Sequence, residues 1–552
     1  MNAKHVARPA LLRSLTLLLV AAASGSALAQ DPKTTFNIVV PAVFGGKNYN
    51  PFTPGAQHAQ PTQSAIYESL FYVNGLDGKV TNVLGTKYAW GAGNKTLTFT
   101  TRSGVTWSDG KPFTAKDVAF TFNYIKANPG LDLGGIWKNG VESVKATNDT
   151  TVVVTFNRVN VPLFSAIAQN MIVPEHLWAS VKDPVTFANE EPVGTGPFLA
   201  ETYSQQAVRV LKNPNYWMKG QPYVDAVAWF STSGNDASLL KMLKGETDYG
   251  YVSIPDPKKD YTSKGADFSY WWPVNSVNAL YLNNLKAPFS DVAFRRAIAQ
   301  AIDTKDVADK AYAGVVPAAD PTGIIPGQQK QWKPSDVAAL APKFNPAAAD
   351  AALTAAGYKK NAQGVRLGKD GKPMPSFKIL VGAGWTDFIT IAQVVGENLK
   401  ALGIKTSIDQ QEYPAYAGSL QSATYDMGVS WGWGSGPTPY YLYFQSFAPE
   451  FSGPVGKQAS SNLSHFTNPD LTKAIIAFSS TSDAAAQKKA VGTMVSVVLK
   501  NQPWIPLTAR TSFNVYNTSR LTGFPTAENP YNDGTPSDAV GGRMMLINVK
   551  PK

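Results

Sequence analysis

Residues 377–410, FKILVGAGWTDFITIAQVVGENLKALGIKTSIDQ, contain the pattern that decides the fold. The run over 377–384 is apolar and typical of a buried strand. The segment 387–403 has the spacing of a helix that ends at Gly403, and residues 404–410 again resemble a strand. A strand, a crossover helix and a second strand imply parallel pairing, and a parallel sheet is covered on both faces. We therefore expect an α/β protein.

The same unit predicts where a ligand binds. In open α/β sheets, ligands bind beyond the carboxyl ends of the strands. This rule places the loop that contains Trp385 at the edge of a cleft. A further strand is expected within 423–433, and it runs directly into the uncharged stretch WGWGSGPTPYY, residues 431–441. Two loops that carry aromatic rings are thus expected on one side of one sheet.

The stretch 431–441 combines large rings with five helix-breaking residues, so we do not expect a regular helix there. Its rings are those of Trp431, Trp433, Tyr440 and Tyr441. Loops rich in Gly and Pro lie on the surface, and their side chains serve function more often than core packing. Flat apolar faces with a polar edge suit a sugar ring, and they also suit a peptide with apolar side chains. For any single ring, core packing is the alternative.

Other local patterns complete the expected secondary structure. The segment 113–130 predicts a helix, because Thr114 and Asp117 have capping-box spacing and Pro129 and Gly130 end the run. Runs rich in β-branched residues, bounded by Gly, Asn or Asp, predict three strands, within residues 34–43, 96–107 and 150–159.

The first 29 residues predict export. Lys4, Arg8 and Arg13 precede a short apolar run, and the segment ends in Ala-Leu-Ala at 27–29. These are the parts of a secretory signal peptide that is cut after Ala29. The apolar run is shorter than the roughly 18 residues that a membrane span needs. We expect an exported protein, and a periplasmic one.

Composition excludes several classes of protein. The 552 residues include no cysteine, which excludes disulfides, thiolate metal sites and the cysteine to which lipid anchors are attached, so we do not expect a lipoprotein. The net charge of +11 comes from scattered Lys and Arg, and with export this argues against a nucleic-acid partner. The few histidines lie far apart, and no phosphate-binding loop is complete. We expect neither a metal nor a cofactor.

A hydrolase remains a remote alternative. GVSWG, residues 428–432, has the letters of a nucleophile turn around Ser430, with His465 and Asp470 downstream. Such a turn must open a helix and be followed by Asp and then His. Here four helix breakers occupy the seven residues 433–439, and the order is Ser, His, Asp. An exported serine hydrolase is therefore disfavoured, and an envelope structural protein would show repeats that the sequence lacks.

Six segments resemble, in order, the family-5 extracytoplasmic solute-binding proteins of ABC importers. This group includes proteins that bind oligopeptides, dipeptides, nickel and cello-oligosaccharides. Any one segment would be weak, but the six together cover nearly the whole chain. The segments are TLTFTTRSGVTWSDGKPFTAKDVAFTFNYI (96–125), IVPEHLW (172–178), PVGTGPF (192–198), VLKNPNYW (210–217), LYLNNLKAPFSDVAFRRAIAQAID (280–303) and YDMGVSWGW (425–433).

The resemblance implies a two-lobed periplasmic-binding-protein fold of the large class, with an extra domain in the N-terminal lobe. The chain is expected to cross between lobes near Asn275 to Tyr281 and near Trp504 to Thr508. The family has no catalysis, since closure around the solute creates the surface that the membrane permease recognises. The expected divisions are a signal peptide at 1–29, lobe I at 30–73, 191–275 and 506–552, the extra domain at 74–190, and lobe II at 276–505.

The resemblance also bears on the ligand. In peptide-binding relatives, the loop that corresponds to 431–441 carries an aspartate that pairs with the amino terminus of the peptide. That position falls at Gly436 here. A free ammonium group buried without a counter-charge is strongly unfavourable. The paired tryptophans and tyrosines of this loop instead resemble those of cello-oligosaccharide-binding members, where rings stack on sugars.

By the same resemblance, further residues are expected to contact the ligand. Trp271 and Trp272 lie at a lobe crossing, and Asn275 follows with an amide for a hydroxyl group. Asn48 and Asn50 follow the first strand, where lobe I of the family reaches its ligand. The expected solute is an oligosaccharide, and the alternative is an oligopeptide bound mainly through its backbone. The expected protein partner is an ABC permease, and the chain itself is expected to be a monomer.

Overall fold

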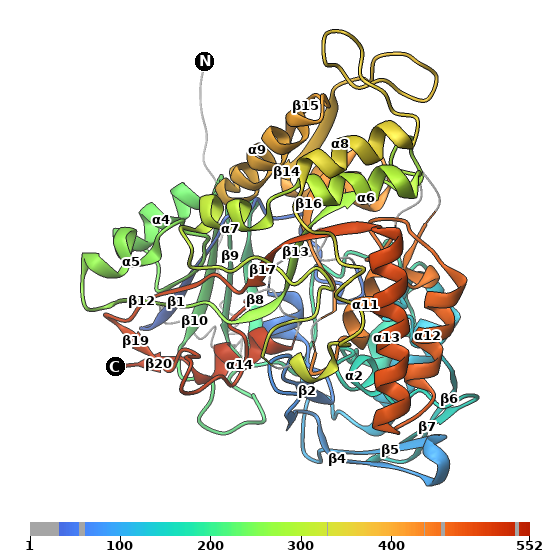
Figure 1. The fold of residues 1–552 in the computed structure, drawn as a ribbon. Coiled ribbons are helices and arrows are strands. Elements are labelled where there is room, and N and C mark those ends of the chain that lie inside the picture. Colours follow the sequence, from blue (N-terminus) through green and yellow to red (C-terminus); the bar gives the residue numbers. More distant parts are fainter. Residues whose placement is uncertain (1–32, 54–60, 328, 435, 454–458, 536–539) are drawn as a thin grey trace, which may run out of the picture.

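The computed structural model describes residues 33–53, 61–327, 329–434, 436–453, 459–535 and 540–552, and Figure 1 shows their fold. The expected signal peptide, residues 1–29, lies outside the described residues. Three larger β-sheets organise the rest. Two of them belong to one body, which we call lobe I (33–271 and 514–552), and the third forms lobe II (274–511).

Lobe I is built on a seven-stranded mixed sheet with the order β12-β18-β11-β1-β10-β9-β8. The predicted first strand is confirmed as β1. It lies at the centre of this sheet and pairs in parallel with β10 and β11. The helices α4 (Asn235–Leu243), α5 (Pro257–Asp260) and α14 (Gly541–Asn548) belong to the same lobe. The strands are β1 (Thr35–Val40), β8 (Phe198–Tyr203), β9 (Ala207–Lys212), β10 (Ala226–Ser231), β11 (Tyr249–Tyr251), β12 (Phe268–Trp271) and β18 (Asn514–Asn517).

A four-stranded antiparallel sheet, β4-β5-β7-β6, lies within the range expected for the extra domain and occupies the lower right of Figure 1. The predicted helix is confirmed as α1 (Ala115–Ala127), which begins with a capping box between Thr114 and Asp117. The strands predicted within 96–107 and 150–159 are confirmed as β5 and β7. The elements here are β4 (Gly85–Trp90), β5 (Thr96–Thr101), β6 (Val141–Asn148), β7 (Thr151–Phe156), α2 (Leu163–Ala168) and α3 (Glu175–Trp178), together with the hairpin of β2 (Phe71–Val73) and β3 (Val80–Asn82).

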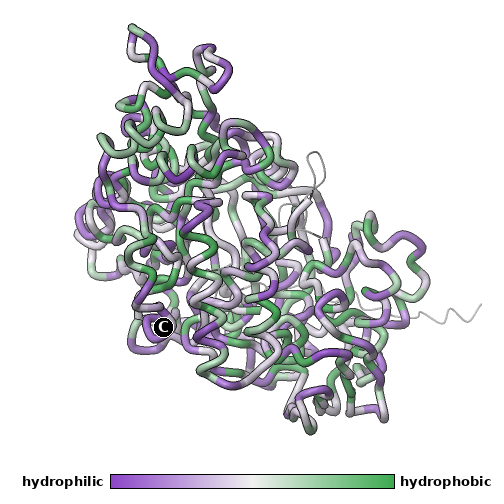
Figure 2. Tube along the Cα trace, turned by 45° about the vertical axis from the view of Figure 1, so that its right-hand side comes forward, coloured by the Kyte–Doolittle hydropathy of each residue, from purple (hydrophilic) through white to green (hydrophobic). Residues whose placement is uncertain are grey.

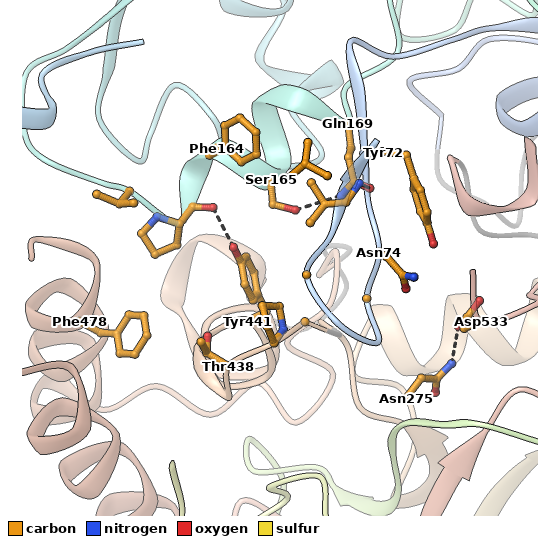
Figure 3. A pocket seen from close by; sticks show the side chains of 18 of the residues that line it. Tyr72, Asn74, Phe164, Ser165, Gln169, Asn275, Thr438, Tyr441, Phe478 and Asp533 are labelled. Atoms are coloured by element: carbon orange, nitrogen blue, oxygen red, sulfur yellow. Dashed lines mark hydrogen bonds between the residues drawn. The ribbon is translucent and has the colours of Figure 1, made fainter. Parts of the chain in front are cut away.

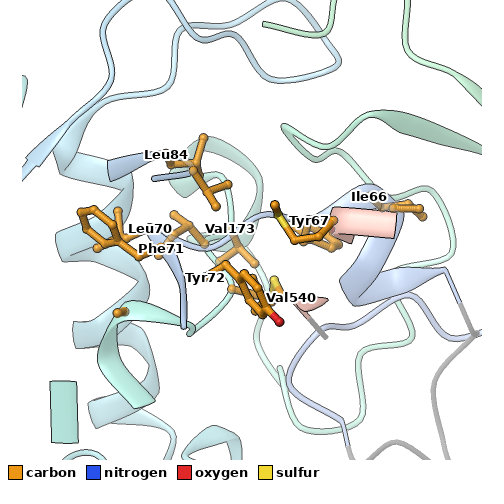
Figure 4. Close-up of a cluster of buried hydrophobic side chains, with 14 of the residues drawn as sticks. Ile66, Tyr67, Leu70, Phe71, Tyr72, Leu84, Val173 and Val540 are labelled. Atoms are coloured by element: carbon orange, nitrogen blue, oxygen red, sulfur yellow. The ribbon is translucent and has the colours of Figure 1, made fainter. Parts of the chain in front are cut away.

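One continuous core joins these two sheets. Figure 4 shows part of it, where Tyr67, Leu70 and Phe71 pack near Leu84 and Val540. A buried ion pair ties the C-terminal segment to the same core, because the guanidinium of Arg543 lies 2.6 Å from the carboxylate of Glu68. The small sheet of β19 (Leu521–Thr522) and β20 (Lys550–Pro551) completes the lobe. Because the core is shared, we treat lobe I as one body.

Lobe II is built on the five-stranded sheet β15-β14-β16-β13-β17. The predicted strand-helix-strand unit is confirmed, since β14 pairs in parallel with β15 and the helix α9 (Thr386–Ala401) connects them. The sheet is mixed, because β13 runs antiparallel to both β16 and β17. The strands are β13 (Val274–Leu282), β14 (Phe377–Gly382), β15 (Thr406–Gln411), β16 (Met427–Trp431) and β17 (Trp504–Thr511).

Both faces of this sheet are covered, as expected for a buried parallel unit. Leu280 and Leu282 face one apolar core, whereas Ala279 and Tyr281 face another. The first core contains α6 (Val292–Ala301), α7 (Thr304–Tyr312), α8 (Pro346–Ala355) and α9, and the second contains α10 (Tyr413–Gln421), α11 (Tyr440–Phe447), α12 (Pro469–Ser479) and α13 (Ala484–Asn501).

The chain crosses between lobes at positions slightly different from those expected. It leaves β12 and enters β13 through Trp272–Pro273, and it leaves β17 and enters β18 through Ser512–Phe513. The predicted crossings at 275–281 and 504–508 were wrong by a few residues, because those segments pair with each other inside the lobe II sheet. The lobe boundaries expected at residues 275 and 505 therefore lie at Trp272–Pro273 and Ser512–Phe513 instead.

Hydropathy alternates along the described chain. Figure 2 shows hydrophobic and hydrophilic stretches following one another over short distances. Among the described residues, the search for a helix with the length and apolar character to cross a bilayer finds none.

Candidate ligand-binding cleft

A cavity of about 510 Å³ lies between the two lobes, and Figure 3 shows its lining. Its volume falls in the range of about 300–1,000 Å³ that is usual for small-molecule sites. Lobe I contributes Tyr72, Asn74, Tyr88, Trp90, Phe164, Ser165, Gln169, Asp533 and Thr535, among others, and lobe II contributes Asn275, Gly436, Pro437, Thr438, Tyr441, Phe478, Gln487 and Arg510.

Three rings form what we call the ring wall: Tyr88, Trp90 and Phe164. Tyr88 and Trp90 stand two residues apart on β4, so they project from the same face of the strand. Phe164 approaches from α2, with its ring centroid 4.4 Å from that of Tyr88. The strand β4 lies at the edge of its sheet, and Tyr88 remains 38% exposed. The ring wall thus presents an apolar surface to the cavity.

Most polar groups in the cavity are neutral. Gln169 is fixed in place, because it donates a hydrogen bond to Ser165 at 2.9 Å and accepts one from the backbone N–H of Val73 at 3.0 Å. The side-chain amide of Asn74 is also fixed in place, because its NH₂ group donates a hydrogen bond to the carbonyl of Pro530. Amides held in this manner are positioned to recognise hydroxyl or peptide groups without presenting a net charge. The other neutral groups are Asn275, Gln487, Thr438 and Thr535.

Two charged side chains, Arg510 and Asp533, stand out among the described residues that line the cavity. They belong to different lobes, and Asn275 lies between them. Its amide oxygen accepts a hydrogen bond from Arg510 at 3.2 Å, and its NH₂ group donates one to Asp533 at 2.7 Å. Asn275 therefore lines the cavity as expected, and its amide connects the two charges.

Gly436 is packed against Tyr441. A Cβ atom at this glycine would lie 2.6 Å from the Tyr441 ring, so a larger residue would displace that ring. The hydroxyl of Tyr441 donates a hydrogen bond of 3.2 Å to the carbonyl of Pro162, which links lobe II to lobe I across the cavity (Figure 3). Burial raises the pKa of Tyr441 to about 12, so its hydroxyl stays protonated and remains a donor.

The predicted tryptophan loops do meet. Ring centroids lie 6.0 Å apart for Trp385 and Trp431, and 5.9 Å apart for Trp431 and Trp433. We call these three rings the tryptophan cluster. They gather where β14 and β16 end, since those strands are parallel. All three are half-buried against the lobe II cores rather than lining the cavity described above. Trp431 reaches that cavity indirectly, because the Arg510 guanidinium lies 5.5 Å from its ring centroid.

Other predicted ligand residues lie in the structure as follows. Tyr440 is buried and stacks on Phe478, with centroids 4.9 Å apart. It is also the first residue of α11, so the expectation that 431–441 holds no regular helix fails at its end. The helix can begin there because Pro439 precedes its first turn, where proline is tolerated.

The asparagines near the first strand have structural partners. Asn50 is fully buried, and its amide donates to the carbonyls of Pro184 and Phe187. The side-chain oxygen of Asn48 accepts from the backbone N–H of Asn50 at 2.9 Å. Their contact with a ligand stays a prediction that these hydrogen bonds do not support.

The tryptophans at the lobe crossing are half-buried. Trp271 ends β12 and packs against the core of lobe I. Trp272 lies in the crossing itself and packs edge-on against Phe513, which belongs to the second crossing, with centroids 5.2 Å apart. Trp272 thus lies in the crossing and Trp271 directly before it, and a ligand contact of either ring stays a prediction.

Ser430, His465 and Asp470 do not form a hydrogen-bonded triad. Ser430 is buried within β16. The two ring nitrogens of His465 face the carbonyl oxygens of Gly453 and Leu420, at 2.7 and 3.3 Å. Asp470 is exposed at the start of α12. Within the described part of the chain, a search for three or more clustered His, Asp or Glu side chains that could hold a metal finds none.

Sequence reasoning missed the ring wall and both charges. One local signal existed, since GTKYAW (85–90) places two aromatic residues on one face of a strand that is otherwise polar. Phe164, Arg510 and Asp533 have no comparable signal, because nothing in their own segments shows that they face a common space.

Residues 79–453 match the family described as "Bacterial extracellular solute-binding proteins, family 5 Middle". The glutathione-binding protein GsiB of Salmonella typhi is 25% identical over 527 residues, which cover 92% of this chain and 95% of that protein.

Solved structures with the same fold span almost the whole chain. One is an oligopeptide-binding protein of an ABC transporter from Thermotoga maritima, solved with mannohexaose bound; it is 26% identical, has a TM-score of 0.88, and the match covers 94% of this chain and 99% of that one. The oligopeptide-binding protein AppA from Bacillus subtilis, solved with a nonapeptide, has a TM-score of 0.80 at 20% identity, and the match covers 94% of this chain and all of that one. The second likeness shows the fold alone.

Proposed function

The chain belongs to family 5 of the bacterial extracellular solute-binding proteins, which serve ABC importers, and on that premise we propose that its solute is a neutral oligosaccharide. The carrying observation is the cavity between the lobes, in which the ring wall faces neutral amides and hydroxyls. Sugar rings have apolar faces for stacking and hydroxyl groups at their edges. The relative from Thermotoga that binds mannohexaose supports the same choice of ligand.

The packing of Gly436 further supports a ligand without a free amino terminus. An aspartate at this position, as in the corresponding loop of peptide-binding relatives, would place its Cβ atom 2.6 Å from the Tyr441 ring. The glycine and the inward position of Tyr441 are therefore coupled. The loop gives a ring to the cavity where a peptide-binding loop would give a carboxylate.

The cavity has walls from both lobes, so a bound solute gains contacts only when the lobes are closed. Ligand binding then shifts the population toward the closed form. Direct contacts between lobes accompany closure, such as the hydrogen bond of 2.9 Å from the Trp385 indole to the carbonyl of Pro41. In this proposal the closed protein is a monomer, delivers its solute to an ABC permease and performs no chemistry on it.

The proposal includes export. The chain is made with a signal peptide that is cut after Ala29, and it works in the periplasm without a lipid anchor, since it has no cysteine to carry one.

An oligopeptide is the second candidate, and one observation favours it. Arg510 and Asp533 both line the cavity and could pair with the carboxylate and ammonium groups of a peptide. The related glutathione-binding protein GsiB, which binds a peptide, agrees with this alternative.

A thermal-shift panel separates the two candidates. The mature protein is refolded free of any co-purified solute and heated with mannohexaose, cellohexaose, glutathione or a nonapeptide. A ligand at about one hundred times its dissociation constant adds about 2.7 kcal/mol to stability. The proposal predicts a raised unfolding temperature with at least one sugar and none with the peptides. A rise with peptides alone would overturn it, and hydrolysis of any ligand would overturn the binding-only role.

A further inference from the structure

The two charged residues of the cavity have opposite charges and are connected through the side-chain amide of Asn275. Arg510 is the next-to-last residue of β17 in lobe II, whereas Asp533 lies between β19 and α14 in lobe I. Asn275 joins them with hydrogen bonds of 3.2 and 2.7 Å, and its side chain is almost completely buried. We call this arrangement the charge bridge. Its members come from both lobes, so it forms only when the lobes are together.

The carboxylate of Asp533 is already well supplied with donors. Besides Asn275, the hydroxyls of Ser512 and Thr535 each donate to it at 3.1 Å. The backbone N–H of Thr535 donates to its other oxygen at 2.9 Å. A carboxylate that accepts this many hydrogen bonds gains little from one more donor.

Arg510 is held in a fixed direction. One of its nitrogens donates to Asn275, and another donates to the hydroxyl of Tyr251 at 3.3 Å. Its guanidinium also lies over the Trp431 ring. A guanidinium has five N–H donors in all, so it retains hydrogen-bonding capacity for a ligand oxygen.

We propose that the charge bridge selects the charge of the solute: it admits neutral polyhydroxyl chains and disfavours chains with an ammonium or a carboxylate group at this end of the cavity. The inference rests on the proposed function, because it assumes a neutral oligosaccharide as the normal solute. It assigns specificity to Asn275, Arg510 and Asp533, three residues that are far apart in the sequence.

The physical reason is that neither sign of charge gains a free counter-charge. A ligand ammonium must compete with the donors already on Asp533. A ligand carboxylate beside Arg510 also meets the negative charge of Asp533 beyond a single amide. Each ionic group in addition loses its hydration on entry, which is unfavourable unless a good partner replaces the water. A sugar hydroxyl has no charge, so it needs no counter-charge and loses no ionic hydration. It can also donate and accept hydrogen bonds at the same time.

Three matched ligands test the charge bridge: mannohexaose, its derivative oxidised to a terminal carboxylate, and its derivative with a terminal amine. Dissociation constants are measured by titration calorimetry for the wild type, Asp533→Asn, Arg510→Gln and the double variant. The wild type should bind the neutral sugar about tenfold more tightly than either ion.

Each single variant leaves one charge without its partner. We expect Asp533→Asn to improve the affinity for the acid relative to the neutral sugar by about tenfold, and Arg510→Gln to do the same for the amine. The double variant should again bind the neutral sugar more tightly than either charged derivative, as the wild type does. These shifts should shrink as salt is added, because salt screens interactions between charges.

Matched controls change the net charge elsewhere. Asp309→Asn on α7 and Arg209→Gln on β9 alter the protein charge equally but lie outside the cavity. They should leave the order of the three ligands unchanged. Unchanged relative affinities in the cavity variants, with mannohexaose still bound, would overturn this inference alone. A wild type that binds none of the three sugars would overturn the proposed function and this inference with it.

Discussion

The molecule has two groups of aromatic rings, and they differ in what their surroundings allow. The tryptophan cluster lies at the ends of parallel strands in lobe II, and its rings pack half-buried against the two cores of that lobe. The ring wall lies on an edge strand and a short helix of lobe I, and its rings line the cavity. Most of the rings concentrated in 431–441 thus pack against the lobe II cores, and Tyr441 is the ring of that stretch that lines the cavity, whereas the three rings of the ring wall come from separate segments.

The comparison indicates that local density of aromatic residues is a weaker guide to a binding site than incomplete coverage of a ring by the core. A ring at the end of a central strand has two cores beside it and packs against them. A ring on a sheet face that the packed layers cover only in part, such as Tyr88 on β4, remains available to a ligand. Four variants test this difference between the two groups of rings and their surroundings.

Replacing Trp433 by alanine should chiefly lower stability. Its ring packs against a lobe II core and contacts Trp431. Truncating a fully buried tryptophan to alanine lowers the free energy of unfolding by about 3–5 kcal/mol. For this half-buried ring we expect a loss of about 2 kcal/mol. We expect a lower unfolding temperature and a dissociation constant for mannohexaose within about threefold of the wild type. Trp433→Phe is the control and should recover most of the stability. A large loss of affinity at unchanged stability would place Trp433 in the binding site.

Replacing Gly436 by aspartate should weaken sugar binding by about tenfold, equivalent to about 1.4 kcal/mol. The new Cβ atom displaces the Tyr441 ring from the cavity. Gly436→Ala should have a similar effect, because the clash arises at Cβ and not at the carboxylate. Gly418→Ala is the control, since a Cβ atom there meets nothing within 4 Å. Equal affinities for the wild type and both Gly436 variants would show that Tyr441 has no role in binding.

Replacing Tyr88 by alanine should reduce affinity for mannohexaose by about fivefold, close to the 1 kcal/mol typical of ring stacking. Stability should fall less than in Trp433→Ala, because Tyr88 is 38% exposed, although its ring contacts those of Phe71 and Phe164. Tyr223→Ala removes another exposed tyrosine, 46% exposed and outside the cavity, and should alter neither quantity. Matching dissociation constants for Tyr88→Ala and the wild type would show that Tyr88 does not contribute to sugar binding.

Replacing Asp387 by asparagine should give a small gain in stability that depends on pH. Burial raises the pKa of this carboxyl above its usual range, while hydrogen bonds from Tyr312 and Asn235 partly offset that effect. A raised pKa in the folded state means that the contribution is full below the unfolded pKa, about 3.9, and is lost as pH rises through the folded value.

The unfolding temperatures of the wild type and Asp387→Asn should therefore diverge as pH rises from about 4 toward 7, with the variant higher. Asparagine can keep both hydrogen bonds, as an acceptor from Asn235 and a donor to Tyr312. A constant difference across this pH range would mean that Asp387 does not titrate with folding. Because Asp387 lies at the start of α9 beside Trp385, the result also probes the surroundings of the tryptophan cluster.

Local patterns made much of the fold predictable from the sequence. The unit in 377–410 could be recognised because apolar spacing and a terminal glycine depend only on neighbouring residues. The helix that follows Thr114 was predictable for the same reason, since its capping box lies within four residues. The lobe crossings were placed a few residues away, because their limits depend on the pairing of β13 with β17, more than two hundred residues apart.

The candidate site was predictable only in part. Asn275 and the loop that ends at Tyr441 were expected from the resemblance, and both line the cavity. The reason for Gly436 could not be read from the sequence, because it depends on where the Tyr441 ring lies. The pairing of Arg510 with Asp533 was also beyond sequence reasoning, since it requires two lobes to meet around one asparagine.

The most direct test of the account is a calorimetric titration of the refolded mature protein with mannohexaose, repeated with Phe164→Ala, which removes a ring from the centre of the ring wall. The account predicts one bound hexasaccharide per chain and a dissociation constant at least about tenfold weaker in the variant, measured at a temperature where both proteins are folded. The variant should also unfold at a lower temperature, because Phe164 packs half-buried against the lobe I core and stacks on Phe99. Heat released by the nonapeptide or glutathione but not by the sugar would contradict it. So would a sugar that binds equally well to both proteins.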